Sequence, residues 1–272
     1  MTDPSATRSW VPAAAREAAT VLLARDAAEG VEILLVERHL QSKMAGGAFA
    51  FPGGRLEPAD AAPGAERLCR GLTVAGAAAR LSDVAPPDRA IGYWVAALRE
   101  AFEEVGLLLA YDPGGTPLVE DGAVQKRLAD HRARCAADAA AFRAMLEAET
   151  LTLATDRMAY LAHWITPEAR PVRYDTRFFV AAAFPDAAPE PDGVEAVGAR
   201  WLTASGALAE QAAGRLVLPF VTRRILASVA AYPSVAALLE GVRALAVRRV
   251  MPRIVVAGGE ERFLLPGDAG YG

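Results

Sequence analysis

Hydrophobic positions along the chain form short strand-like runs and longer helix-like repeats. The apolar runs predict strands at residues 19–25, 31–38, 48–51, 107–111, 158–165, 176–184 and 195–202, and a terminal hairpin at 254–257 and 262–265. Stretches with helical periodicity predict helices at 89–105, 119–149 (as one or two helices), 204–214, 219–231 and 234–248. Asp88 is placed to cap the helix at 89–105, and Gly106 is placed to end it. Strands and helices interleave without a regular βαβ rhythm, so we expect an α+β fold in which helices flank a mixed β-sheet.

The helix predicted at residues 89–105 carries an acidic face. Its apolar residues cover one arc of about 100°, and Glu100, Glu103 and Glu104 fall together on the opposite face. Each like-charged neighbour pair at this spacing costs about 0.2–0.5 kcal/mol. Solvation on a polar face would offset this cost, and so would a bound hard cation, which carboxylate oxygens suit. The helix alone leaves both interpretations open.

Composition narrows the class of protein. The chain has 272 residues, of which 53% are hydrophobic and 23% charged, so a packed core is expected. A net charge of −4 argues against a nucleic-acid surface. The longest strongly apolar run, 178–184, is far shorter than the roughly 18 residues of a membrane-spanning helix, and residues 1–11 do not resemble a signal peptide. Cys69 and Cys135 suit a reducing compartment. We therefore expect a cytoplasmic protein without membrane or nucleic-acid partners.

A glycine turn precedes the acidic helix. Phe51-Pro52-Gly53-Gly54 follows a predicted strand, permits close backbone approach, and offers a glycine carbonyl to a metal shell. Together with Arg99-Glu100-Ala101-Phe102-Glu103-Glu104-Val105-Gly106-Leu107 it resembles the Nudix box, the signature of hydrolases that act on nucleoside diphosphates linked to another moiety. Gly54 matches the opening glycine of the box, and Asp60 stands where the family has glutamate.

The main departure from the box is its length. Residues 61–98 separate Asp60 from Arg99, where the family pattern has seven residues, and we place the insertion at 61–88. Loop-closure entropy grows slowly with length, so an insertion that bulges outward is tolerable. A similar long insertion occurs in a Nudix subgroup that contains the peroxisomal coenzyme A diphosphatases of animals.

The resemblance implies roles for the residues of the box. It implies Glu100, Glu103 and Glu104 as ligands of Mg²⁺ or Mn²⁺, together with the carbonyl of Gly54. It also implies that Arg99 orients the glutamates and that Arg99, Glu100 and Glu103 are catalytic, with Glu100 the candidate general base. A metal-activated water would then attack a diphosphate phosphorus.

Residues 34–54 resemble the coenzyme A motif of some Nudix enzymes. The residues in register are Leu34, Leu35, Arg38, Gly47 and Phe51 to Gly54. Lys43 replaces an arginine of the motif and keeps its charge. The resemblance implies that Arg38 and Lys43 bind substrate, and Arg55 is included with them. The alternative is that Arg38 and Lys43 are ordinary surface charges beside a strand.

Weaker signals lie further along the chain. Residues 173–179 look like a segment of the same subgroup, which would bring Arg177 or Arg173 near substrate phosphates. The alternative is a strand entry held by an Asp–Arg pair. Glu195 could supply an extra carboxylate. The three histidines, His39, His131 and His163, show no metal-ligand spacing and are expected to be structural or exposed.

The resemblance implies a metal-dependent diphosphatase that converts coenzyme A or acyl-coenzyme A to 3′,5′-ADP and 4′-phosphopantetheine. Two alternatives stay open: a pyrophosphatase of ADP-ribose, nucleoside-diphosphate sugars or dinucleotides, and a nucleotide-sensing module without turnover. We expect a leader at 1–18, the Nudix domain at 19–232 with a helical insertion at 119–149, and a C-terminal helix and arm at 233–272. Apolar helix faces in the helical insertion and the arm allow a homodimer.

Overall fold

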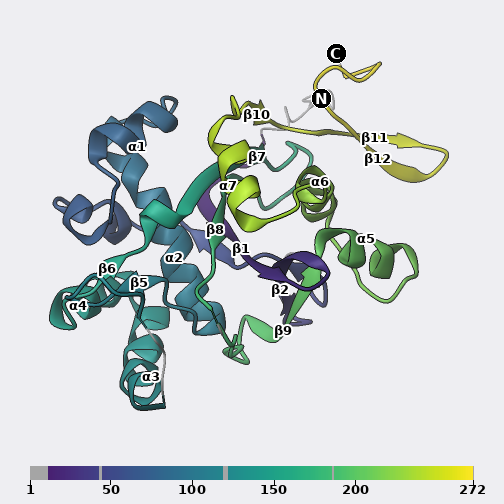
Figure 1. Cartoon of the computed structure of the whole chain (residues 1–272). Coiled ribbons are helices and arrows are strands. Elements are labelled where there is room, and N and C mark those ends of the chain that lie inside the picture. The colour runs from purple at the N-terminus through teal and green to yellow at the C-terminus, as the bar shows by residue number, and fades with distance from the viewer. Residues whose placement is uncertain (1–11, 43–44, 119–121, 186, 272) are drawn as a thin grey trace, which may run out of the picture.

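An eight-stranded mixed sheet runs through the middle of the protein (Figure 1). The computed structural model describes residues 12–42, 45–118, 122–185 and 187–271. The strands of the sheet are β1 (Arg16–Ala27), β2 (Gly30–Arg38), β3 (Phe49–Ala50), β4 (Gly53–Arg55), β7 (Met158–Ile165), β8 (Tyr174–Ala182), β9 (Ala196–Thr203) and β10 (Arg249–Val250). Their order is β10-β7-β8-β1-β2-β3, with β4 paired to β1 and β9 paired to β2. The β1–β8 and β7–β10 pairs are parallel and the others antiparallel, which confirms the mixed sheet.

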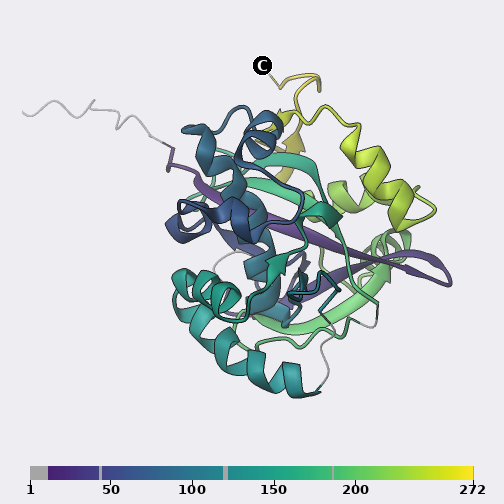
Figure 2. The same cartoon turned by 60° about the vertical axis from the view of Figure 1, so that its left-hand side comes forward.

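Helices cover both faces of this sheet (Figures 1 and 2). On one face lie α1 (Val74–Arg80), α2 (Gly92–Val105), α3 (Gly122–Ala137) and α4 (Ala139–Ala148). On the other face lie α5 (Ala204–Ala212), α6 (Phe220–Val229) and α7 (Val235–Arg243). The predicted α+β fold with helices on both faces is therefore confirmed, and the helical stretch predicted at 119–149 forms two helices, with 119–121 outside the described residues.

Smaller elements complete the chain. Two two-stranded sheets are formed by β5 (Ala110–Tyr111) with β6 (Thr152–Leu153), and by β11 (Arg253–Ala257) with β12 (Glu260–Leu264). Short 3₁₀ helices occupy Pro58–Ala61, Ala65–Leu68, Pro87–Ile91 and Thr155–Arg157.

The central strand β1 shows why both faces of the sheet are covered. Val21 and Leu23 pack into the core beneath α2, whereas Leu22 and Ala24 pack into the core beneath α6 and α7. Successive side chains of a strand point to opposite faces, so a continuous apolar run buries both. The free energy gained by this burial fixes the sheet between two helical layers.

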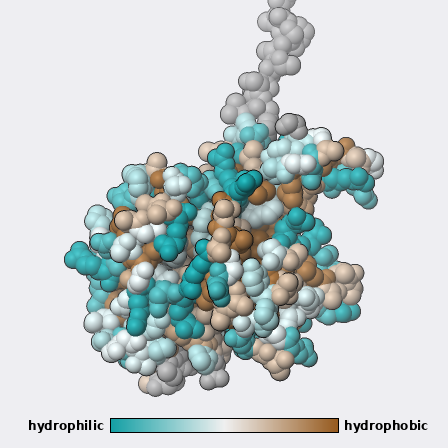
Figure 3. All heavy atoms as spheres, turned by 45° about the horizontal axis from the view of Figure 1, so that its top comes forward, coloured by the Kyte–Doolittle hydropathy of each residue, from teal (hydrophilic) through white to brown (hydrophobic). Residues whose placement is uncertain are grey.

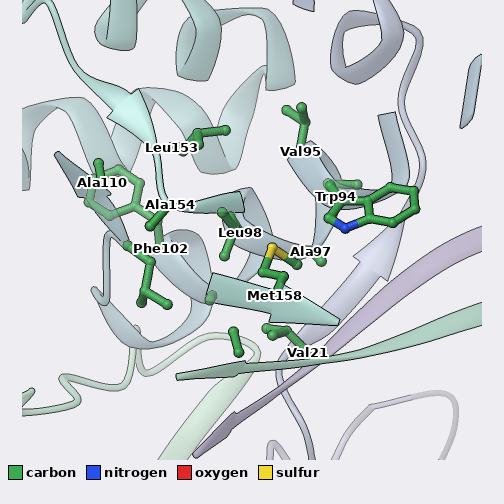
Figure 4. Packing of buried hydrophobic residues seen from close by; sticks show 14 of the residues in the cluster. Val21, Trp94, Val95, Ala97, Leu98, Phe102, Ala110, Leu153, Ala154 and Met158 are labelled. Carbon is green, nitrogen blue, oxygen red and sulfur yellow. The ribbon is translucent and has the colours of Figure 1, made fainter. Parts of the chain in front are cut away.

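The core beneath α2 holds that helix against the sheet (Figure 4). Trp94, Leu98 and Phe102 from α2 gather with Val21 of β1 and Met158 of β7, and none of these side chains is more than 5% exposed. Their spacing of about one helical turn places them on one face of α2. The catalytic segment predicted from the sequence therefore lies on a helix fixed by the main core.

Segments other than the sheet also pack on α2. Phe102 of α2 and Phe142 of α4 have ring centroids 6.1 Å apart, and Gly92 packs so closely on Ala61 that an added Cβ would lie 2.8 Å from the Cβ of Ala61. Segments from inside the box and after it thus pack on α2. Glu104, predicted on the face opposite the apolar arc, is only 3% exposed.

The start of α2 differs from the prediction. The helix predicted at 89–105 begins at Gly92, and Pro87–Ile91 forms a 3₁₀ helix before it. Asp88 lies inside that 3₁₀ helix and caps neither element, so its predicted capping role is wrong. Pro87 is the first residue of this 3₁₀ helix, and a proline favours that position because its φ is already fixed.

Other boundaries shift for reasons of pairing. β1 already begins at Arg16, inside the predicted leader 1–18, because it pairs with the start of β8. The strand predicted at 107–111 is reduced to β5, outside the main sheet. The glycine turn continues as β4, since Gly53 and Gly54 pair with β1. The helix predicted at 234–248 ends at Arg243.

Among the described residues, no helix is long and apolar enough to cross a membrane. The face in Figure 3 mixes hydrophilic and hydrophobic residues without a continuous hydrophobic band.

Candidate active site

The sheet and α2 bring the two halves of the predicted box together. β4 pairs with β1, which places Gly54 opposite Ala19. Gly54 then packs against Glu100 of α2, and a Cβ added at Gly54 would lie 2.5 Å from the Glu100 carboxylate. A side chain does not fit there, so glycine is required for close approach rather than for an unusual φ. At the other end of the helix, Gly106 adopts the left-handed conformation with φ 70° and ends α2 as predicted.

Arg99 lies at the centre of the site. It is 3% exposed, and its Nη1 donates to Glu100 Oε1 at 2.8 Å and to Glu103 Oε2 at 3.0 Å. Its Nη2 also donates to the carbonyl oxygen of Arg55 at 2.8 Å. One guanidinium thus connects two glutamates of α2 to the backbone of β4. This is the orienting role that the sequence predicts for Arg99.

Asp60 supplies the other side of this arginine. Its Oδ1 and Oδ2 accept from Arg99 Nε at 2.8 Å and Nη2 at 3.0 Å, the two-pronged geometry of a strong carboxylate–guanidinium pair. Oδ2 also accepts from the backbone N–H of Glu57 at 2.8 Å, which closes the 3₁₀ helix Pro58–Ala61. Asp60 is 2% exposed. The shorter carboxylate at this box position therefore orients Arg99.

Burial raises the pKa of the carboxyl groups in the cluster. Desolvation raises the pKa of Glu100 to about 7 and that of Glu103 to about 8, although Arg99 opposes both shifts. Burial and then the charge of Glu100 hold the pKa of Glu104 well above its usual value. The pKa of Asp60 is also raised by burial, against the opposing effect of Arg99. One arginine does not compensate four carboxylates.

Three oxygens of the cluster have no hydrogen-bond partner in normal geometry: Glu103 Oε1 and both oxygens of Glu104. A buried carboxylate oxygen without a donor is costly, and oxygen-rich acidic sites suit Mg²⁺ or Mn²⁺. The residues present thus fit a divalent cation. In the described part of the chain, no three acidic, histidine or cysteine side chains already converge as a metal-binding group. Arg99 instead holds Glu100 and Glu103 in this conformation.

A cleft of about 980 Å³ opens over this cluster. Gly54, Glu100 and Glu103 line it, together with Arg38 of β2 and Arg55 of β4. Glu104 is not part of the lining. A volume of this order is at the upper end of small-molecule sites, so a nucleotide with a long appended group has room.

The predicted substrate-binding residues divide into three cases. Arg38 and Arg55 reach the cleft, and Lys43 lies outside the described residues. Arg177 is 3% exposed, forms ion pairs with Asp83 (2.6 Å) and Asp175, and is not among the residues that line the cleft. Its environment matches the structural alternative, an arginine held by an aspartate at a strand entry.

The side chain of Arg173 also forms structural hydrogen bonds. It donates to the carbonyl oxygens of Thr166 at 3.0 Å and Ala13 at 2.7 Å. The buried histidine, His163, lies 2.6 Å from Asp175 through Nε2. Arg173 and His163 therefore connect segments of the structure, in agreement with the structural alternatives given in the sequence analysis.

Several residues of the cleft are missed by the sequence analysis. Arg16 lines it from the first position of β1, in a segment predicted as a leader. Residues 135–140, the corner between α3 and α4, also line it, and only the fold brings this corner to the box. Glu195, named from the sequence as a possible extra carboxylate, lies in the lining as well, and its charge contributes to the raised pKa of Glu100.

Comparison with known proteins agrees with this geometry. A family model described as the NUDT19 Nudix domain matches residues 69–219. A NUDIX hydrolase from Alicyclobacillus acidocaldarius is 29% identical, with a TM-score of 0.67 over 84% of this chain and 96% of that chain. A MutT NUDIX hydrolase from Burkholderia pseudomallei is 16% identical, with a TM-score of 0.41 over 80% and 99% of the two chains.

The fold and the arginine–glutamate cluster beside Gly54 define a Nudix hydrolase, an enzyme that cleaves diphosphate linkages. Within that class, the chain belongs to the NUDT19 Nudix domain family. The resemblance inferred from the box and its insertion is therefore confirmed. The matched range contains the helical half of the box but not its glycine half. A nucleotide-type substrate and a divalent metal are typical of this class.

Asp60→Asn should destabilise the protein and impair catalysis. Removing one partner of a buried ion pair costs about 3–5 kcal/mol, because the charge of Arg99 remains buried with weaker partners. Urea unfolding measures the stability, and steady-state hydrolysis measures the activity. Asp130→Asn on exposed α3 is the control and should change stability by no more than about 0.5 kcal/mol. A variant at position 60 that behaves like this control would show that the pair is dispensable.

Gly54→Ala should separate stability from activity. The added methyl displaces the Glu100 carboxylate rather than backbone, so the melting temperature should fall less than that of Asp60→Asn. Misplacing a catalytic group by about 1 Å can cost on the order of 100-fold in rate, and we expect a loss of that size. Gly114→Ala, in a loop remote from the cleft, is the matched control. Wild-type turnover of Gly54→Ala would contradict the contact.

Stability of the metal-free protein should fall as the pH rises. The pKa of Glu100 (about 7) and of Glu103 (about 8) exceed the value in the unfolded chain, so the folded state binds more protons between about pH 4.5 and pH 8. Divalent metal needs deprotonated ligands, so its stabilising effect should grow over the same window. Thermal melts at about pH 5, 6.5 and 8, with and without Mg²⁺, measure both slopes.

The variant Glu103→Gln should flatten this pH dependence, whereas Glu240→Gln on exposed α7 should preserve it. A melting temperature of the metal-free protein that rises with pH across this window would contradict the raised pKa values of the cluster.

Proposed function

We propose that this enzyme hydrolyses the diphosphate of coenzyme A or acyl-coenzyme A, releasing 3′,5′-ADP and 4′-phosphopantetheine. The observation that carries the proposal is Arg38, which combines a register position in the coenzyme A motif with a place in the cleft above the box. The long insertion between Asp60 and Arg99 and membership of the NUDT19 family support the same substrate.

Charge in the cleft supports a substrate with several phosphates. Arg16, Arg38 and Arg55 all line it, from three different strands. The guanidinium of Arg99, by contrast, is occupied by carboxylates and a carbonyl, so it is not free to bind phosphate. We assign substrate binding to Arg38 and Arg55. Arg177 is left out because aspartates hold it away from the cleft.

The proposed roles in catalysis follow from the cluster. Glu100, Glu103, Glu104 and the carbonyl of Gly54 would hold Mg²⁺ or Mn²⁺, which lowers the pKa of bound water and neutralises charge on phosphoryl oxygens. Glu100 is the candidate base that takes the proton of the attacking water. Arg99 keeps Glu100 and Glu103 in position. Water adds its oxygen to one phosphorus, the bridging P–O bond breaks, and the leaving phosphate keeps the bridging oxygen.

A pyrophosphatase of ADP-ribose, nucleoside-diphosphate sugars or dinucleotides is the alternative, because the box itself does not distinguish these substrates. A nucleotide sensor without turnover is disfavoured by the complete set of Glu100, Glu103, Glu104 and Arg99. A cytoplasmic location and a homodimer stay predictions. The domain bounds of 19–232 also stay a prediction, and β1 and β10, which extend beyond them, both belong to the main sheet.

A substrate screen with product identification tests the proposal. Wild-type enzyme with Mg²⁺ or Mn²⁺ should convert coenzyme A to 3′,5′-ADP and 4′-phosphopantetheine with a higher kcat/KM than it shows for ADP-ribose or dinucleotides. Glu100→Gln should lower kcat by at least about 100-fold at saturating metal, the size expected for loss of a general base. Glu240→Gln is the matched control and should retain wild-type turnover.

Absence of coenzyme A cleavage would refute the proposed substrate, and preferred cleavage of ADP-ribose would establish the alternative. Wild-type turnover by Glu100→Gln would refute the base assignment while leaving the substrate assignment intact.

A further inference from the structure

A turn outside the box is fastened to the catalytic helix. The backbone N–H of Glu190 donates to the carbonyl of Val105 at 2.8 Å, and that of Asp192 donates to the carbonyl of Glu104 at 3.0 Å. The last carbonyls of a helix have no partner within it, so these bonds satisfy the end of α2. The segment 190–196 is therefore held by hydrogen bonds to the end of the helix that carries the glutamates of the box.

Arg132 of α3 strengthens this attachment. Its Nε donates to the carbonyl of Glu103 at 3.0 Å, and its Nη2 donates to the carbonyl of Glu190 at 2.7 Å. One side chain thus bridges α2 and the segment 190–196. The attachment involves three consecutive carbonyls, those of Glu103, Glu104 and Val105.

The carboxylate of Asp192 closes the turn that follows. Its Oδ1 accepts from the backbone N–H groups of Val194 at 3.0 Å, Glu195 at 3.0 Å and Ala196 at 2.8 Å. Gly193 adopts a φ of 74°, which a tight turn at this position requires. A charged acceptor of three amides is a strong local constraint. Asp192 therefore fixes the backbone direction at Glu195.

The opposite side of the turn is fixed by β2. The backbone N–H of His39 donates to the carbonyl of Glu195 at 3.0 Å, and the β2–β9 pairing shifts register between Glu37 and Arg38. Such an irregularity redirects side chains at the end of a strand pair. Glu195 and Arg38 both line the cleft at this place. Glu195 thus lines the cleft that contains Glu100 and lies close enough to act on its charge, while the backbone of Glu195 is held from two sides.

We propose that Asp192 is a positioning residue for hydrolysis: it holds the 192–196 turn closed on the end of α2 and so places Glu195 as an additional carboxylate of the reaction site. Glu195 adds negative charge beside Glu100, where a divalent cation and the attacking water are expected. The proposal rests on the proposed hydrolysis at this site, but it does not depend on which diphosphate is the substrate.

A double-mutant cycle between Asp192→Ala and Glu195→Gln tests this inference. Each single variant should lower kcat, with Mg²⁺ present, by about 10–100-fold, the size typical for groups that orient metal-site ligands. The double variant should be no worse than the more impaired single variant, because Asp192 acts through Glu195. In the absence of substrate, Mn²⁺ affinity measured by calorimetry should show the same non-additive pattern.

Asp112→Ala is the matched control, since Asp112 Oδ1 accepts from the N–H of Thr116 at 2.9 Å in a comparable turn that does not line the cleft. It should leave both readouts unchanged. Asp192→Asn keeps an acceptor and should recover part of the activity. If Asp192→Ala does not fold, as judged by its thermal melt, the cycle is run with Asp192→Asn.

Independent, additive losses for the two substitutions would overturn the proposal, and so would wild-type turnover and Mn²⁺ affinity in Glu195→Gln. The turnover ratios are measured on whichever diphosphate the wild-type enzyme hydrolyses, and calorimetry needs no substrate. Failure of the coenzyme A assignment is seen in the wild-type screen alone, so the two failures are distinguishable.

Discussion

The buried guanidinium of Arg99 is the constraint on which the site depends. It fills the space between a box aspartate, two helix glutamates and a strand carbonyl. These groups belong to three different elements of the fold. A charge at this depth is tolerable only when its donors are satisfied. The strand β4, the 3₁₀ helix Pro58–Ala61 and α2 are therefore held in register by one hydrogen-bonded centre.

The insertions help to bury the carboxylates around Arg99. An amphipathic helix on a sheet usually keeps one face in water, whereas α2 is covered on its outer side by segments from inside and after the box. Arg143 of α4 ties these segments together by donating to the carbonyl of Pro63 at 2.9 Å. The extra layer adds to the burial of Glu100 and Glu103, which still line the cleft, and this burial is the main cause of their raised pKa values.

Sequence reasoning predicted the parts of the site that are local. Periodicity located α2, Gly106 ended it, and the glycine pair with the Arg99–Glu100 spacing identified the box. What it missed depends on contacts between distant segments. From the sequence, Asp60 is only a shorter replacement for the glutamate of the box, and its pairing with Arg99 is visible only in the structure. The sequence likewise allows Arg177 to bind phosphate, and only the structure shows its pairing with Asp83.

The same limit applies to the boundary errors. Arg16 belongs to β1 because β8 pairs with it, and no pattern within residues 1–18 reveals that partner. Glu104 is buried although it belongs to the acidic face of α2, and helical periodicity does not encode this burial. Local signals thus predicted the elements and the class of enzyme. The burial of side chains and the pairing of distant segments are visible only in the three-dimensional structure.

The burial of the Glu104 carboxylate has an evolutionary consequence. Burial of an acid weakens the fold, so selection for stability alone would favour an apolar side chain at this position. Given the role proposed for Glu104 in hydrolysis, the acid should persist only while hydrolysis is under selection. A descendant of this chain that lost its catalytic role would therefore be free to replace Glu104 early, and an apolar residue there would mark such a lineage before any change in the fold became visible.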